Sequence, residues 1–360
     1  MRALLTLGLL AASSLARADD AVGVGAAVGA GGQGAATYGA LELRLDAEWR
    51  GARLGLGARG VWLDGRFRGG DWDRAADAVT VLRLLELHTP GGTGALAAGA
   101  LAPAQLAQVA DGYRMALDDH PRTGVRGSVT TGAMALDLEI DDVLHPALAG
   151  GALAVQLVPA WGLRAAAAVD PVGTHAVTEL GLARRWSAAR ARTELGGGLV
   201  FEPGSGGSAV VFAQVARDRG GARWSASADL RAGTGTVGGA FGPLYRLERR
   251  ELWRHAESGA GAGVSASVAA PAGWLAASMR ARPGLGFVGT LSAGAPMGRW
   301  LQAGAWAAAS TRAAAGAAEL RIAWARRMFS ALQLARMYDT DAMQPTAQWS
   351  ATAWFGATSD

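Results

Sequence analysis

Residues 222–232 alternate apolar and polar side chains with a period of two. The even positions are all apolar, and the odd positions from Arg223 to Arg231 are Arg, Ser, Ser, Asp and Arg. Successive side chains of a β-strand point to opposite faces, so this segment presents one apolar and one charged face. The charged face is expected to meet water, and the apolar face either a protein core or lipid.

The same alternation recurs along most of the chain. Clear examples are residues 41–50, 134–141, 153–157, 161–169, 319–324 and 347–355, separated by turn sequences such as 90–92, 203–207 and 282–284. At about 20 residues for a membrane strand and its connection, roughly 16 to 18 strands are predicted. We expect an all-β fold in one domain, with residues 97–110 as a short helix or loop.

The first residues have the organisation of an export signal. Arg2 precedes an apolar run over residues 3–12, and Ala16-Arg17-Ala18 matches a small-residue cleavage site. The alternative is an N-terminal anchor helix, but the run is shorter than the roughly 20 residues that span a bilayer. We therefore expect a cleaved signal peptide over 1–18 and a mature chain over 19–360.

Composition restricts the remaining possibilities. The chain has no Cys, which excludes disulfides and thiolate metal sites, and all 34 basic residues are Arg. The net charge is only +4 despite the high isoelectric point, so a basic nucleic-acid-binding face is not expected. No apolar run after the signal is long enough to predict a transmembrane helix.

Tryptophans stand near the ends of several apolar runs, at Trp49, Trp62, Trp186, Trp300 and Trp349. Amphipathic rings gather at both interfaces of a bilayer and form girdles around membrane barrels. Packing inside a soluble β-sandwich is the alternative.

Together, the signal, the alternating strands, the absence of Cys and the closing segment 349–355 resemble a bacterial outer-membrane β-barrel of porin type. The resemblance implies a single transmembrane antiparallel barrel with a polar lumen, in the outer membrane of a Gram-negative bacterium. Such barrels commonly end on an aromatic residue, and Phe355 fits that position if residues 356–360 form a tail. No specific porin family matches, so no functional residues are carried over.

Motifs for enzymatic chemistry are weak. Two G-x-G-x-x-G matches, at 55–60 and 233–238, lack the following helix of a dinucleotide fold and are interpreted as strand or turn glycines. Asp118-Asp119-His120 is the best candidate for water activation, and Asp141-Asp142 with His145 is the second. A solvated polar turn that ends at Pro121 is the favoured interpretation of the first group, and we predict no catalytic residue, cofactor or metal.

The charged faces of the alternating strands are the predicted pore lining. These candidates are Glu42, Arg44, Asp46, Glu48, Asp137, Glu139, Arg223, Asp229, Arg231, Glu319 and Arg321. A soluble sheet would also leave such a face to water, so periodicity alone leaves both folds open. Because both signs are present, weak ion selectivity is expected.

The densest charge cluster lies between two strand regions, over residues 245–255. Its candidate constriction residues are Arg246, Glu248, Arg249, Arg250, Glu251 and Arg254. An ordinary solvated loop is the favoured interpretation of this segment, and a pore constriction is the alternative.

The sequence predicts a porin-like channel for passive passage of small hydrophilic solutes, surrounded by outer-membrane lipid. The first alternative is a non-conducting barrel that serves a structural or export complex with an envelope protein partner. A barrel hydrolase is the second alternative. The loops 64–77 and 101–122 are long enough to plug the lumen.

Overall fold

The computed structural model describes residues 21–358, except 70–71, 73, 102–103, 114–121, 173–174, 189, 205, 235–240, 246, 248–258, 285, 299, 326–327 and 339–346. The predicted signal peptide therefore lies outside the described residues. Within the described part, no helix is both long and apolar enough to cross a membrane.

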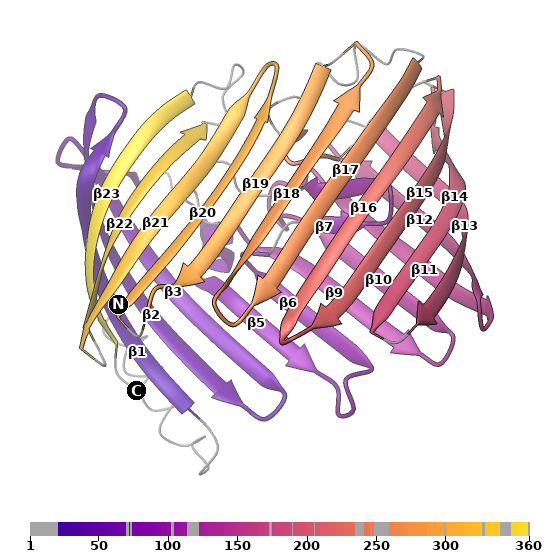
Figure 1. The fold of residues 1–360 in the computed structure, drawn as a ribbon. Coiled ribbons are helices and arrows are strands. Elements are labelled where there is room, and N and C mark those ends of the chain that lie inside the picture. The colour runs from indigo at the N-terminus through magenta and orange to yellow at the C-terminus, as the bar shows by residue number, and fades with distance from the viewer. Residues whose placement is uncertain are drawn as a thin grey trace.

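In the described residues, 20 antiparallel strands form a closed ring, and Figure 1 shows them inclined around the barrel. In ring order they are β1 (Ala21–Gln33), β2 (Ala36–Trp49), β3 (Ala52–Leu63), β5 (Leu82–His88), β6 (Gly94–Gly99), β9 (Gly124–Thr131), β10 (Met134–Ile140), β11 (Ala149–Val158), β12 (Trp161–Asp170), β13 (His175–Ala188), β14 (Ala191–Glu202), β15 (Gly206–Arg219), β16 (Ala222–Gly233), β17 (Gly259–Ala270), β18 (Gly273–Arg282), β19 (Gly286–Pro296), β20 (Leu301–Ser310), β21 (Ala314–Ala325), β22 (Met328–Tyr338) and β23 (Ala347–Thr358).

Outside the ring, the described part of the chain includes three short strands and a seven-residue 3₁₀ helix. They are β4 (Arg66–Phe67), which pairs with β3; the 3₁₀ helix η2 (Ala75–Val81); and β7 (Ala104–Leu106) with β8 (Ala110–Tyr113), which form a separate hairpin. The predicted helix or loop over residues 97–110 is therefore wrong in part, because it contains the end of β6 and most of this hairpin.

The fold confirms the predicted all-β antiparallel barrel, but the predicted range of 16 to 18 strands is too low. Many strands are joined by only two residues, so each strand uses less of the chain than expected. In the β15–β16 turn, Gly220 and Gly221 both have positive φ, at 60° and 79°. That backbone matches the twist of tight hairpins and favours glycine at both positions.

The two rims of the barrel differ. At the short-turn end, where β1 begins and β23 ends, two-residue turns join β2 to β3, β11 to β12 and β15 to β16. At the opposite, long-loop end lie the connections 64–81, 100–123, 234–258 and 339–346. The asymmetry matches that of outer-membrane barrels, which have short periplasmic turns and longer extracellular loops.

The outer face of the ring is predominantly apolar. Leu199 and Leu230 are 66% and 67% exposed, and each lies on a strand whose alternate residues point into the barrel. Five tryptophans stand on this outer face at the short-turn end: Trp49, Trp161, Trp186, Trp224 and Trp324. Of the other predicted girdle residues, Trp62 and Trp349 lie towards the long-loop end, whereas Trp300 precedes β20 at the short-turn end.

The ring closes where β1 pairs with β23, at a seam built for close approach. A Cβ atom on Gly31 would lie 1.8 Å from the Ala351 carbonyl oxygen, and one on Gly29 would lie 2.8 Å from the Trp354 indole. The pairing continues to Gly25 and Thr358, so residues 356–358 belong to β23. The expected tail after Phe355 is therefore wrong for these residues, because the last strand continues beyond the aromatic.

Candidate pore lining and inner constriction

Five of the predicted pore-lining residues meet around one hollow inside the barrel. Its volume is about 440 Å³, and its wall comes from β1, β2, β3, β21, β22 and β23. The predicted residues in this wall are Glu42, Arg44, Asp46, Glu319 and Arg321. Because β1 pairs with both β2 and β23, the closure of the ring brings the second and twenty-first strands of the chain into one site.

Charges in this hollow are paired locally but stay accessible. Arg44 Nε lies 2.7 Å from an Asp46 carboxylate oxygen, and both side chains are nearly half exposed. The Arg321 guanidinium lies 3.8 Å from the centre of the Phe329 ring, and Gln333 donates a hydrogen bond to Glu319. Exposed ion pairs of this kind contribute little to stability, so their charges remain available to passing solutes.

Sequence analysis missed Arg59, which also lines the hollow. This residue donates a hydrogen bond to the Tyr38 hydroxyl, and its guanidinium lies 5.1 Å from the centre of the Trp354 ring. The signal was available, since Leu54, Leu56 and Ala58 alternate with it. Its position inside a G-x-G-x-x-G match drew attention to the glycines instead, and these are glycines of β3.

The other predicted lining residues lie elsewhere on the inner face. At the short-turn rim, Glu48 lies 3.8 Å from Arg53, and Arg223 lies 3.2 Å from Asp218. Asp137 shares the inner face of β10 with Glu139. Glu139 is buried and accepts a hydrogen bond of 2.8 Å from Arg126.

An inward-folded hairpin occupies part of the lumen. The strands β7 and β8 pack with the segment 241–247 in one apolar cluster against β12, β13, β14 and β15. The buried members from the two inserted segments are Leu106, Val109, Ala110, Tyr113, Phe241 and Tyr245. The Phe241 and Tyr245 rings lie 4.6 Å apart, and the Phe241 amide donates to the Val109 carbonyl oxygen.

The segment 241–247 also reaches another part of the wall. Leu244 is fully buried against Val288, Ala308 and Ala315 of β19, β20 and β21. The Tyr245 hydroxyl donates a hydrogen bond of 2.7 Å to Asp170 at the long-loop end of β12. The segment therefore extends from β12–β15 to β19–β21, and it narrows the lumen where it crosses.

The hairpin turn is held by a network of buried charges, which we name the Gln108 anchor. Arg231, at 2% exposed, donates to the Gln108 side-chain oxygen at 2.6 Å and to its carbonyl oxygen at 3.3 Å. The backbone amide of Gln108 donates a hydrogen bond of 2.6 Å to the Glu179 carboxylate.

Neighbouring residues of the barrel wall balance the charges of Arg231 and Glu179 in the Gln108 anchor. Asp229 accepts hydrogen bonds from Arg231 at 3.1 Å and from both terminal nitrogens of Arg280 at 3.0 Å. Arg164 pairs with Glu179 at 2.9 Å. The predicted residues Asp229 and Arg231 are thus on the inner face, but they hold the hairpin rather than line open space.

The second catalytic candidate is part of this packing. Asp141 is fully buried and accepts hydrogen bonds from the Tyr113 hydroxyl and from the amides of Ala147 and Leu148, both at 3.0 Å. Asp142 pairs with Arg122 at 3.0 Å, and both side chains are buried. Both carboxylates are buried and accept hydrogen bonds from internal donors, an arrangement that does not favour Asp141 and Asp142 as a water-activating pair.

Two other sequence candidates cannot be placed. Asp118-Asp119-His120 and the predicted constriction residues Arg246, 248–251 and Arg254 lie outside the described residues. Within the described part, no three His, Cys, Asp or Glu side chains gather into a possible metal site.

The closed ring, its mostly apolar outer face and its charged inner face together define a large outer-membrane β-barrel of porin type. An inward-folded hairpin narrows the lumen of this barrel. No protein-family model matches the chain, and no curated protein is similar to it in sequence.

Among solved structures, the chain is similar to several outer-membrane proteins of Pseudomonas aeruginosa, including OccK11, OccK9 and OpdK. OccK11 (OpdR) is 11% identical with a TM-score of 0.37, over 94% of this chain and 96% of that chain. OccK9 (OpdG) is 13% identical with a TM-score of 0.37, over 94% and 98%. OpdK, crystallised with vanillate, is 10% identical with a TM-score of 0.36, over 95% and 98%.

Proposed function

We propose that this chain is exported, inserts into the outer membrane of a Gram-negative bacterium, and conducts small hydrophilic solutes passively. The charge-lined hollow between β1–β3 and β21–β23 is the observation that carries the proposal. A ring of this size is wider than the 8-stranded barrels that side chains fill, so water and solutes have room beside the hairpin.

The arrangement of the lumen supports a path along one wall. The inner hairpin packs on β12–β15, whereas the hollow lies on the opposite part of the ring. Solutes would pass the segment 241–247 and then move along the hollow towards the short-turn end. Its charged groups would hydrate and orient solutes, and passage requires no covalent chemistry.

The mixed charges of the hollow predict weak ion selectivity, which neutralising a single residue should change. The hollow contains the acidic residues Glu42, Asp46 and Glu319 and the basic residues Arg44, Arg59 and Arg321. One unit charge about 7 Å from an ion contributes about 0.6 kcal/mol in water before screening. Screening at ~0.1 M salt roughly halves this, so neutralising one charge should change the cation-to-anion permeability ratio about two- to threefold.

Planar-bilayer recording of the refolded chain 19–360 tests the proposal. The wild type should give discrete conductance steps, and the Arg44→Gln and Arg321→Gln variants should shift the reversal potential towards cations. Glu42→Gln should shift it the opposite way, and Arg217→Gln, on the outer face of β15, should leave it unchanged. A membrane-inserted wild type without conductance would overturn the proposal.

The extent of the inner packing favours one second candidate. A barrel plugged by the hairpin and by segment 241–247 would serve a structural or export complex, with an envelope protein as its partner. In that case the folded, heat-modifiable barrel would insert into bilayers but remain silent, including after removal of the hairpin anchor by Arg231→Met.

A further inference from the structure

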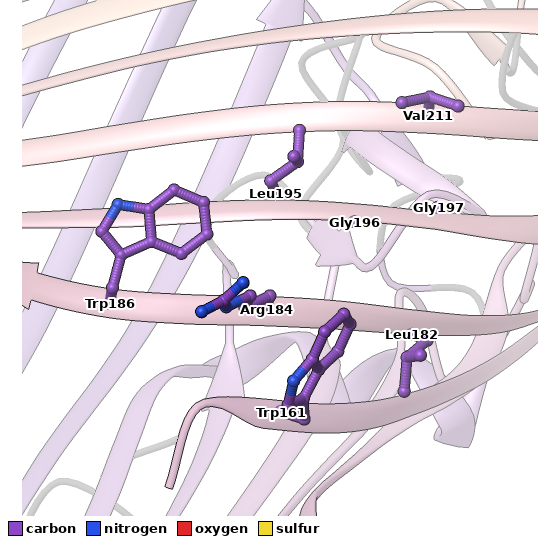
Figure 2. Close-up of a pocket in the computed structure, with 8 residues that line it drawn as sticks. All are labelled: Trp161, Leu182, Arg184, Trp186, Leu195, Gly196, Gly197 and Val211. Carbon is purple, nitrogen blue, oxygen red and sulfur yellow. The ribbon is translucent and has the colours of Figure 1, made fainter.

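Arg184 stands on the lipid-facing side of the barrel, between two tryptophans. Its guanidinium carbon lies 5.8 Å from the centre of the Trp161 ring and 5.9 Å from that of Trp186. Figure 2 shows the side chain between the two indoles, on the outer face of β13. Both distances are within the range of cation–π attraction, so the rings hold the charge in place.

The charge of Arg184 has no acidic partner in the part of the chain that the structure describes. The next residue, Arg185, points inward and pairs with Glu194 at 2.6 Å. An arginine on the lipid face costs about 2–4 kcal/mol at the bilayer midplane but only about 0–1 near the interface. Arg184 is therefore placed at headgroup level by the tryptophans beside it.

A groove extends from Arg184 along the outer wall. Its volume is about 850 Å³, and Leu182, Leu195 and Val211 form its apolar floor. Leu182, Gly197 and Val211 are register neighbours on β13, β14 and β15, and Gly197 lies between the other two. Because Gly197 has no side chain, this row is open between Leu182 and Val211, as Figure 2 shows.

We propose that this groove binds one anionic glycerophospholipid of the periplasmic leaflet. The phosphate contacts Arg184, since a cation without an internal partner favours a charge-assisted hydrogen bond to an anionic oxygen. One acyl chain lies over Gly197, against the flanking aliphatic side chains. In outer-membrane barrels the short-turn end is the periplasmic rim, where the leaflet consists of such lipids. This site is separate from the lumen and does not depend on conduction.

The test uses the folded chain in nanodiscs of phosphatidylglycerol and phosphatidylcholine, followed by native mass spectrometry of the released barrel. The wild type should retain one phosphatidylglycerol in preference to phosphatidylcholine. Arg184→Gln should reduce that adduct about tenfold, as expected for the loss of one charge-assisted contact. Val211→Trp, which fills the groove without changing charge, should also remove it.

Arg217→Gln is the matched control. Arg217 also lies on the outer face near a tryptophan, Trp224, but it does not line the groove. This variant should keep the adduct at the wild-type level, and heat-modifiable migration confirms that every variant is folded. Equal loss of the phosphatidylglycerol adduct in Arg184→Gln and Arg217→Gln would indicate general electrostatic attraction and would overturn the proposed site. Retention by Arg184→Gln, or equal retention of both lipids by the wild type, would overturn it as well.

Discussion

Replacing Arg231 with methionine should loosen the inner hairpin without disturbing the barrel wall. Arg231 is one of the two wall residues that hold Gln108 directly. Methionine keeps a similar length and fills the same space without the charge. Asp229 would not become an unpaired buried charge, because both terminal nitrogens of Arg280 still donate to it at 3.0 Å.

The expected change in hairpin docking follows from the two hydrogen bonds to Gln108 that Arg231→Met removes. Arg231 donates a short bond of 2.6 Å and a longer one of 3.3 Å to Gln108. A hydrogen bond to a charged group contributes about 1.5–3 kcal/mol, so the pair contributes about 3 kcal/mol to the docked state. At about 1.4 kcal/mol for each factor of ten, the ratio of undocked to docked hairpin should rise about 100-fold.

Single-channel recording measures this ratio as the occupancy of the larger conductance substate. Arg223→Met is the matched control, because it removes the same charge from the inner face of the same strand without touching the hairpin. Gln108→Ala should reproduce part of the effect, and adding it to Arg231→Met should produce little further change. An Arg231→Met channel whose substate occupancy equals that of Arg223→Met would refute the role of the anchor.

Three further predictions concern the seam, the buried carboxylate and salt. Gly29→Val should hinder ring closure, because the valine side chain would overlap the Trp354 indole. The measurement is the loss of the heat-resistant folded band in gel electrophoresis. Normal folding of this variant would contradict the seam geometry. Asp141→Asn should weaken the bond to Tyr113 by about 1–3 kcal/mol and increase proteolysis within residues 104–113, whereas unchanged protection would contradict its structural role. The effect of Arg44→Gln on reversal potential should nearly vanish at ~1 M salt, where the screening length is about 3 Å, and a shift that persists would indicate an effect other than the field of the charge.

The strands and their faces could be predicted from the sequence because each strand carries its own two-residue period. The alternation of 41–50 placed Glu42, Arg44 and Asp46 on the inner face, as observed. Their proximity to Glu319 and Arg321 could not be predicted, since it depends on the pairing of the first and last strands across the whole length of the chain.

The anchor shows a second reason why sequence analysis falls short. Asp229 and Arg231 have the spacing of pore-lining charges, and only the inserted hairpin distinguishes them from exposed ones. Gln108 comes from an irregular connection with no periodicity to interpret. The number of strands is underestimated for a simpler reason: two-residue turns let each strand and its connection use fewer than about 20 residues.

The seam between β1 and β23 makes insertion of the barrel depend on both ends of the chain. The first strand leaves its hydrogen-bonding edge unsatisfied until the last one arrives, and in hydrocarbon every unpaired backbone group costs several kcal/mol. A chain truncated before residue 347 would present two bare edges, each able to recruit a strand from another polypeptide. Productive insertion therefore requires the edges of β1 and β23 to be shielded from hydrocarbon until the ring closes. The glycines of β1 then let the final strand approach closely enough to seal the wall.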